Sequence, residues 1–256
     1  MKPIIYFFIT AFSLGVIACS KPDSDGPNGP NPDKAQEGVV KGRVIDSQGK
    51  PVANAEIVAS STDYYNKTST GYTDANGYYN FKLPTGIAAG SYAVSGTVTL
   101  KYHGKNFKMA LYEENTQAFS AYEGAVRNFV FRLTGKRTID DNETASPLGG
   151  ELQIHHQVDN VVRENLEITL EPVGPLVDGS TGKKIVMMMP EADYYIRDIP
   201  VGQYKITARD KVTGAPLGVT IKDTFKDYAA SVTSLFEDKD FSGSTHYEII
   251  LLVNTL

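Results

Sequence analysis

Short segments in which apolar and polar residues alternate run through most of this 256-residue chain, and tight-turn residues separate them. A period of two places every second side chain on the same face of a β-strand. Segments of this kind include residues 55–59, 98–102 and 107–111. Asn76 and Gly77 tolerate positive φ angles and suit a tight connection between strands. Because long segments of helical periodicity are hard to find, the sequence predicts an all-β protein.

The strand pattern occurs twice, in the same order. The segment NAEIVA at residues 54–59 is similar to NLEITL at residues 165–170. The longer segment YYNFKLPTGIAAGSYAV at 78–94 is echoed by YYIRDIPVGQYKI at 194–206. Both contain a strand, a tyrosine pair, a proline-glycine turn and a further tyrosine in an alternating strand. We therefore expect two antiparallel β-sandwich domains of related plan in tandem.

The expected domain boundaries follow the composition. The first sandwich is predicted to cover residues 39–135 and the second residues 149–256. Between them, residues 136–148 are polar and contain Pro147, so we interpret this stretch as a linker.

The segments GRVIDSQGKPVANAEIVAS, GYTDANGYYNFKLPTG and GSYAV in the first predicted domain resemble the carboxypeptidase regulatory-like domain. The resemblance implies a small, transthyretin-like and Ig-like β-sandwich. That family occurs beside zinc carboxypeptidases, at the front of TonB-dependent receptors and in many Bacteroidetes lipoproteins. The residues that match its pattern are turn and core residues, namely Pro51, Ala55, Asp74, Gly77 and Tyr79. The resemblance is therefore specific for the fold and weak for the function.

The N-terminus has the pattern of a targeting signal. Lys2 is followed by the uncharged and mostly apolar residues 3–18. This apolar run is shorter than the roughly 20 residues that span a bilayer as a helix. Val16 to Ala18 precede the single cysteine, Cys19, and resemble the bacterial lipobox. The resemblance implies a signal peptide over residues 1–18, cleavage before Cys19 and lipidation of Cys19. An ordinary secreted protein with an incidental cysteine is the alternative.

The stretch after the cysteine is predicted to be a flexible tether. Residues 19–38 contain four prolines and several Asp and Asn residues, and no large apolar residue. Such a composition cannot bury enough surface to fold. The acidic residues behind Cys19 also resemble the export signal of Bacteroidetes surface lipoproteins. This resemblance implies an outer-membrane lipoprotein exposed on the cell surface, and a periplasm-facing lipoprotein is the alternative.

The charge and the histidines exclude several function classes. The formal net charge is −5, which gives no support to nucleic-acid binding. A zinc carboxypeptidase needs a His-x-x-Glu pair and a third histidine. No histidine of this chain has a glutamate three residues later; the four are His103, His155, His156 and His246. His155 and His156 are adjacent, so on a strand they point to opposite faces and are poorly placed to share one metal ion.

Two carboxylate clusters, Asp140-Asp141 with Glu143 and Glu113-Glu114, lie in turn-like polar segments. A glycosidase needs two carboxylates that face each other across a sugar, so we interpret these clusters as solvated loop charge. No phosphate-binding glycine loop or nucleophile elbow is present. The sequence therefore predicts no catalytic residue, no metal ligand and no cofactor. Weak calcium binding at a loop end stays open.

Tyr64 and Tyr65 lie in the polar loop STDYYNKTST, residues 61–70, where no strand pattern forces them inward. Adjacent exposed aromatic residues stack on sugars or anchor a protein contact. The alternative is that one ring closes the end of the sandwich. The favoured function is a surface binding or adhesion module for a glycan or protein ligand. A structural or accessory subunit of an outer-membrane nutrient-uptake complex is the alternative function.

Overall fold

A computed structural model describes residues 34–85, 90–139, 146–156, 161–191, 193–224, 226–239 and 243–256. The predicted signal peptide and Cys19 lie outside these residues. The regular structure within them is β-strand, apart from one short 3-10 helix, η1 (Arg163–Asn165). The predicted all-β fold class is therefore confirmed. Within the same residues, no helix is long and apolar enough to cross a membrane.

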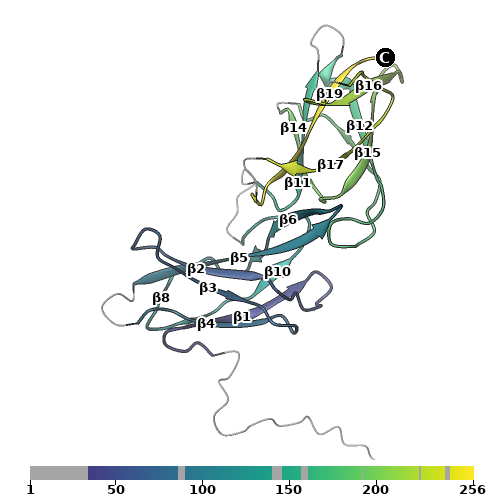
Figure 1. The fold of residues 1–256 in the computed structure, drawn as a ribbon. Coiled ribbons are helices and arrows are strands. Elements are labelled where there is room, and N and C mark those ends of the chain that lie inside the picture. Colours follow the sequence, from purple (N-terminus) through teal and green to yellow (C-terminus); the bar gives the residue numbers. More distant parts are fainter. Residues whose placement is uncertain are drawn as a thin grey trace, which may run out of the picture. The chain divides into compact units, whose positions relative to one another are not determined.

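The first half of the chain forms two facing sheets (Figure 1). One has the strand order β4-β1-β10-β7, with β9 beside β1, and the other has the order β3-β2-β5-β6, with β8 beside β5. Val40 and Phe129 from the first sheet share a core with Ile57, Val94 and Met109 from the second, which makes this half a β-sandwich. The strands are β1 (Val39–Asp46), β2 (Glu56–Ser61), β3 (Thr68–Tyr72), β4 (Tyr78–Lys82), β5 (Ser91–Tyr102), β6 (Lys105–Ala110), β7 (Tyr112–Glu113), β8 (Phe119–Ser120), β9 (Ala125–Val126) and β10 (Phe129–Phe131).

The second half forms one nine-stranded sheet with the order β13-β12-β15-β16-β19-β11-β14. Strand β17 pairs with β15, and β18 pairs with β19. The strands are β11 (Gly150–His156), β12 (Leu166–Pro172), β13 (Ile185–Met188), β14 (Tyr195–Ile199), β15 (Gln203–Asp210), β16 (Pro216–Ile221), β17 (Val232–Leu235), β18 (Glu237–Asp238) and β19 (Tyr247–Thr255).

The two halves share a strand plan, and we call residues 39–131 the first repeat and residues 150–255 the second repeat. The order β4-β1-β10 corresponds to β14-β11-β19, with an antiparallel and then a parallel pair in each. The order β3-β2-β5-β6 corresponds to β13-β12-β15-β16, and all of these pairs are antiparallel. In the second repeat β16 also pairs with β19, which joins the two layers into one continuous sheet. The exact domain boundaries stay a prediction.

The pairing is not antiparallel throughout, and in this respect the sequence-based expectation is wrong. The pairs β1–β10, β1–β9 and β11–β19 are parallel. A hairpin can only join antiparallel strands, whereas a parallel neighbour needs a long connection. In each repeat the last strand, β10 or β19, lies parallel beside the first strand, β1 or β11. Local alternation in the sequence cannot reveal such a pairing.

The period-two pattern matches the observed burial. Ala55, Ile57 and Ala59 on alternate positions around β2 are fully buried. In β5, Val98 and Tyr102 are buried as expected, while Leu100 is only partly buried against the core. Each sheet therefore packs one apolar face against the core. The turns and loops at the ends of the sheets lie outside this core and are the places to search for binding residues.

Candidate functional site

The loop between β2 and β3 carries the two tyrosines that the sequence singled out. Tyr64 is 53% exposed and Tyr65 is 94% exposed, so neither ring closes the end of the sandwich. We call residues 62–67 the tyrosine loop. Single exposed apolar side chains are ordinary on a protein surface, whereas a group of neighbouring ones marks a contact region.

Hydrogen bonds hold the tyrosine loop in one shape. The Ser61 Oγ accepts the backbone N–H groups of Asp63 and Tyr64 at 3.2 and 3.1 Å. The Asp63 carboxylate in turn accepts the backbone N–H of Ser91 at 2.6 Å, which ties the loop to the start of β5. The Ser61 N–H donates to the carbonyl of Lys67 at 2.8 Å and closes the base of the loop. The backbone of the loop is therefore fixed while its aromatic rings face solvent.

The chemistry of the loop combines an aromatic surface with charge. The Lys67 Nζ lies 5.0 Å from the centroid of the Tyr64 ring, within the range of a cation–π contact. This contact occupies one face of Tyr64. Tyr65 is the more accessible ring, and its hydroxyl offers a polar end as well. Such an arrangement suits stacking against a sugar or an apolar side chain of a protein.

A third exposed tyrosine, Tyr122, lies at the same end of the first repeat. Strand β2 ends at Ser61, which pairs with Tyr92 near the start of β5. Strand β8 pairs with the same stretch, since Ser120 lies opposite Ser91. Tyr122 follows β8 directly and is 52% exposed. The sequence analysis missed Tyr122, because only the pairing of β8 with β5 brings this segment to the same end of the sheet as the tyrosine loop.

An open hollow of about 460 Å³ lies elsewhere on the molecule. Three of the polar side chains around it make contacts within the chain, namely Arg132, Asp178 and Ser180. The Arg132 guanidinium lies 3.7 Å over the Tyr112 ring and donates to the carbonyl of Lys136. The Asp178 carboxylate accepts the hydroxyl of Ser180 at 2.6 Å. The hollow is therefore a weaker candidate than the tyrosine loop; its lining residues are Ser47, Arg132, Leu133, Thr134, Leu176, Asp178, Ser180 and Pro200.

Two buried carboxylates were not anticipated from the sequence. Glu167 is 4% exposed and receives Arg209 at 2.5 Å and Lys211 at 2.7 Å. Hydrogen bonds from these two cations lower the pKa of Glu167 from its ordinary value to about 2. Glu151 is similarly buried and pairs with Lys239 at 2.5 Å. Both carboxylates are paired with cations, so we interpret them as structural groups and not as proton donors or acceptors.

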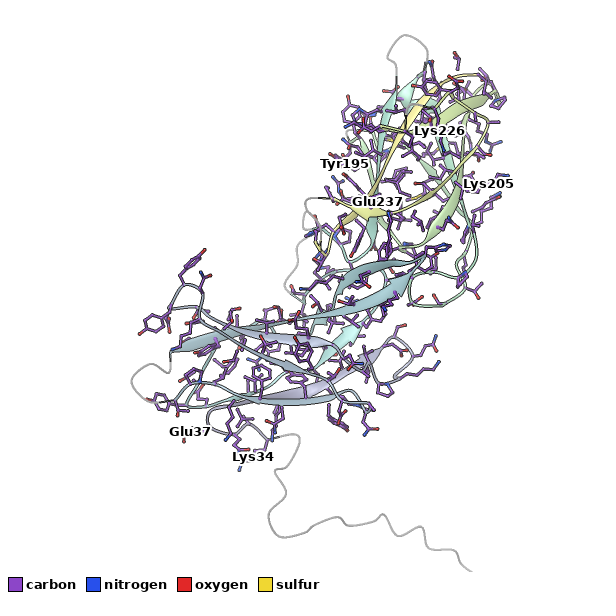
Figure 2. All side chains as sticks on the ribbon, viewed as in Figure 1. Lys34, Glu37, Tyr195, Lys205, Lys226 and Glu237 are labelled. Atoms are coloured by element: carbon purple, nitrogen blue, oxygen red, sulfur yellow. The ribbon has the colours of Figure 1, made fainter. Side chains whose placement is uncertain are left out.

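Tyr195, which is labelled in Figure 2, lies beside the Lys239 end of this second ion pair. The Lys239 Nζ is 5.0 Å from the centroid of its ring, and the Arg197 guanidinium carbon is 4.9 Å from it. Arg197 also approaches Glu151 at 3.6 Å. The cluster therefore fixes β14 against β11 with charge and aromatic contacts.

The other residues weighed in the sequence are dispersed. His103 lies in the β5–β6 turn with a φ of 47° and contacts the ring of Tyr102 edge-on. His155 is exposed on β11. Cys19 and the cluster at 140–143 lie outside the described residues. Among the residues that are described, no three His, Cys, Asp or Glu side chains are grouped so that they could hold a metal ion.

The carboxypeptidase regulatory-like domain model matches residues 39–103. This range contains β1 to β5 of the first repeat and the whole tyrosine loop. It confirms the resemblance inferred from the sequence for this part of the chain. A comparison with curated proteins finds no match.

A comparison with solved structures gives the following matches, each at low identity and with a low TM-score. The Bacillus anthracis TIE protein is 14% identical over 86% of this chain, with a TM-score of 0.33, and this chain covers only 34% of its length. A B repeat unit of the collagen-binding surface protein of Staphylococcus aureus is 14% identical, with 87% of this chain and 100% of that chain covered and a TM-score of 0.24. The major pilin subunit of Bacillus cereus is 10% identical, with 86% and 100% covered and a TM-score of 0.23.

Proposed function

We propose that this chain is a non-catalytic, lipid-anchored protein of the cell envelope that binds a glycan or a protein through the tyrosine loop. The observation that carries the proposal is the 94% exposure of the Tyr65 ring on a loop whose backbone is fixed by hydrogen bonds. A loop ordered in advance loses less conformational entropy when a ligand binds. Loops at the end of a rigid scaffold are also a usual place for binding residues.

The anchor is proposed from the sequence around Cys19. Lipid on this cysteine would attach the protein to the outer membrane, and residues 19–38 would act as the tether that lets the two repeats reach away from the bilayer. One acyl chain holds a protein only marginally, so stable attachment requires more than one chain on the lipidated residue. We place the protein on the cell surface, where a glycan or protein ligand of the environment is accessible.

Catalysis has no part in this proposal. The region that matches the carboxypeptidase regulatory-like domain supplies turn and core residues, and fold alone does not imply an activity. The two buried acids, Glu151 and Glu167, are neutralised by neighbouring cations and are not aimed at a common site.

The binding role is tested by changing both tyrosines of the loop. A pull-down from intact cells with the anchor preserved first identifies the ligand. The double variant Tyr64→Ala, Tyr65→Ala should then weaken binding by about 2 kcal/mol or more, the range of a binding hot spot. Tyr72→Ala is the matched control, because Tyr72 is 63% exposed at the far end of β3. Unchanged binding by a folded double variant would refute the proposal.

The anchor is tested separately. Cys19→Ser removes the sulfur that would carry the lipid, and the variant should move from the membrane fraction to the soluble fraction of lysed cells. Wild-type fractionation of the variant would show that the attachment does not depend on this cysteine.

A further inference from the structure

Strand β13 (Ile185–Met188) ends the nine-stranded sheet and exposes apolar side chains. It pairs with β12 on one side, and no described strand pairs with its other side. Val186 is 52% exposed and Met188 is 40% exposed on the outer face of the sheet. An exposed edge strand with apolar side chains is a template for pairing with another strand.

The main-chain groups of the same two residues point away from β12. The Met189 N–H donates to the carbonyl of Leu166 at 3.0 Å, which continues the β12–β13 register. In an antiparallel pair the residues bonded to the partner alternate with residues whose N–H and C=O face outward. Met187 therefore bonds to β12, and Val186 and Met188 present their N–H and C=O groups at the free edge.

The equivalent edge of the first repeat is different. Met188 lies opposite Glu167, and Tyr72 lies opposite Glu56 at the corresponding position of β3. By the same alignment Thr70 of β3 corresponds to Val186. The outward positions of β3 are polar or hydroxylated, while those of β13 are purely apolar. The apolar edge is thus a property of the second repeat and not of the shared strand plan.

We propose that β13 pairs edge to edge with β13 of a second copy of this chain. In an antiparallel pair centred on Met187, Val186 of one copy lies opposite Met188 of the other. In each such pair the N–H of each residue donates to the C=O of the other. The apolar side chains of the two residues then meet on the outer face of the sheet. When this register is continued beyond both ends of the ladder, it brings Lys183 of one copy near Glu191 of the other, twice in the symmetric dimer.

Charge complementarity favours this partner and this register. Lys183 and Glu191 are exposed, and neither forms an ion pair with another described residue. Pro190 has no N–H, and its carbonyl accepts the Arg163 guanidinium at 2.8 Å, so the ladder ends before Pro190. The contact is therefore short, two-fold symmetric and closed, which limits it to a dimer. This inference does not depend on the proposed role of the tyrosine loop.

The backbone part of the proposal is tested by proline. Sedimentation equilibrium of the full-length chain in detergent should show a concentration-dependent monomer–dimer equilibrium. Val186→Pro removes an N–H that the monomer does not use and the dimer uses twice, so the dissociation constant should rise by about tenfold or more. Thr70→Pro makes the same change at the equivalent edge of the first repeat and should leave dimerisation unchanged. A wild-type chain that stays monomeric, or equal weakening by Thr70→Pro, would overturn the proposal.

The register is tested by charge reversal, which does not disturb the strand. Lys183→Glu and Glu191→Lys should each raise the dissociation constant by roughly two- to fivefold, since exposed ion pairs contribute modestly. The double variant Lys183→Glu, Glu191→Lys restores opposite charges across the dimer and should recover wild-type affinity. A double variant as weak as the sum of the two single variants would exclude this register and the proposal with it.

Discussion

The hydroxyl of Tyr102 donates to the carbonyl of Pro175 at 2.7 Å and accepts the N–H of Gln203 at 3.0 Å. One side chain at the end of β5 thus satisfies two backbone groups of the second repeat. The neighbouring Phe107 ring lies 5.1 Å from the Tyr247 ring, and the Tyr247 hydroxyl accepts the N–H of Lys108 at 2.6 Å. The β5–β6 hairpin therefore connects the two repeats through buried aromatic residues.

Tyr102→Phe should destabilise the protein by about 1–3 kcal/mol, because it leaves a backbone carbonyl and a backbone N–H without their partner. The measurement is urea unfolding followed by circular dichroism. Tyr72→Phe is the control: its hydroxyl bonds to Glu56 at 3.3 Å in solvent, and its loss should be close to neutral. Equal midpoints for the two variants would show that the Tyr102 bridge contributes nothing.

A neighbouring ion pair should matter much less. Glu237, which is labelled in Figure 2, lies 2.8 Å from the Lys105 Nζ, but the side chains of Lys105 and Glu237 are 51% and 65% exposed. Exposed pairs contribute about 0–1 kcal/mol. Glu237→Gln should therefore shift the unfolding midpoint less than Tyr102→Phe. A shift as large as that of Tyr102→Phe would mean that charge, and not the buried tyrosine, dominates this contact.

Tyr204 in the second repeat and Tyr92 in the first repeat hold equivalent positions, but their hydroxyl groups differ in hydrogen bonding. Tyr204 donates its hydroxyl to the carbonyl of Pro200 at 2.7 Å, and burial raises its pKa to about 12. Tyr92 occupies the same place in the first repeat and is fully buried, yet its hydroxyl has no hydrogen-bond partner among the residues that the structure describes. Tyr204→Phe should cost about 1 kcal/mol of unfolding free energy, while Tyr92→Phe should be neutral or stabilising. The reverse order in urea unfolding would contradict the hydrogen-bond assignment.

The sequence predicted local structure well because strand alternation and turn residues act locally. The echo between NAEIVA and NLEITL corresponds to β2 and β12, which hold the same position in the two repeats. The apolar density of HYEIILLVN, residues 246–254, predicts a central strand that is buried on both faces. β19 does lie between β16 and β11, but it alternates between buried and half-buried residues, so one of its faces is less covered.

What the sequence could not predict depends on long-range contacts. The parallel pairing of β1 with β10 joins residues that lie far apart in the chain. Tyr122 and the buried pair of Glu167 with Arg209 were missed for the same reason, because neighbouring strands bring these residues together. Tyr64 and Tyr65 could be singled out because their exposure follows from a local loop. Whether they bind a ligand stays a prediction.

Gly42 lies at a position of β1 where no side chain larger than a hydrogen atom fits. A Cβ at this position would lie 1.7 Å from the carbonyl oxygen of Arg127. That carbonyl also accepts the Tyr79 hydroxyl at 2.6 Å, so it is held from two sides. Gly42→Ala should therefore destabilise the protein by about 1–3 kcal/mol or more, as overpacking does. Gly104→Ala is the comparison, because its φ of 77° adds backbone strain of roughly 1–2 kcal/mol while no described atom lies within 4 Å of the new Cβ. Urea unfolding should show the larger loss for Gly42→Ala, and the opposite order would contradict the steric argument.

The buried Glu167 should give the stability of the protein a specific pH dependence. Its pKa is lowered to about 2 by hydrogen bonds from Arg209 and Lys211, whereas the unfolded chain has the ordinary value of 4.5. An acid with a lowered pKa in the folded state stabilises the fold above its unfolded pKa, and this stabilisation is lost as the pH falls toward the folded pKa. Glu167→Gln cannot lose a proton. The difference in unfolding midpoint between wild type and Glu167→Gln should therefore be largest above about pH 5 and shrink toward about pH 2.

Urea unfolding between about pH 2 and pH 7 measures this difference. Glu171→Gln serves as the matched control on the same strand. The pKa of Glu171 is also lowered by its hydrogen bond from Lys184, but both side chains are about half exposed and water screens the pair. The pH-dependent part should therefore be clearly smaller for Glu171→Gln. A constant offset between wild type and Glu167→Gln across the whole range would show that the ion pair is not the source, because packing and hydrogen bonding of the side chain do not titrate.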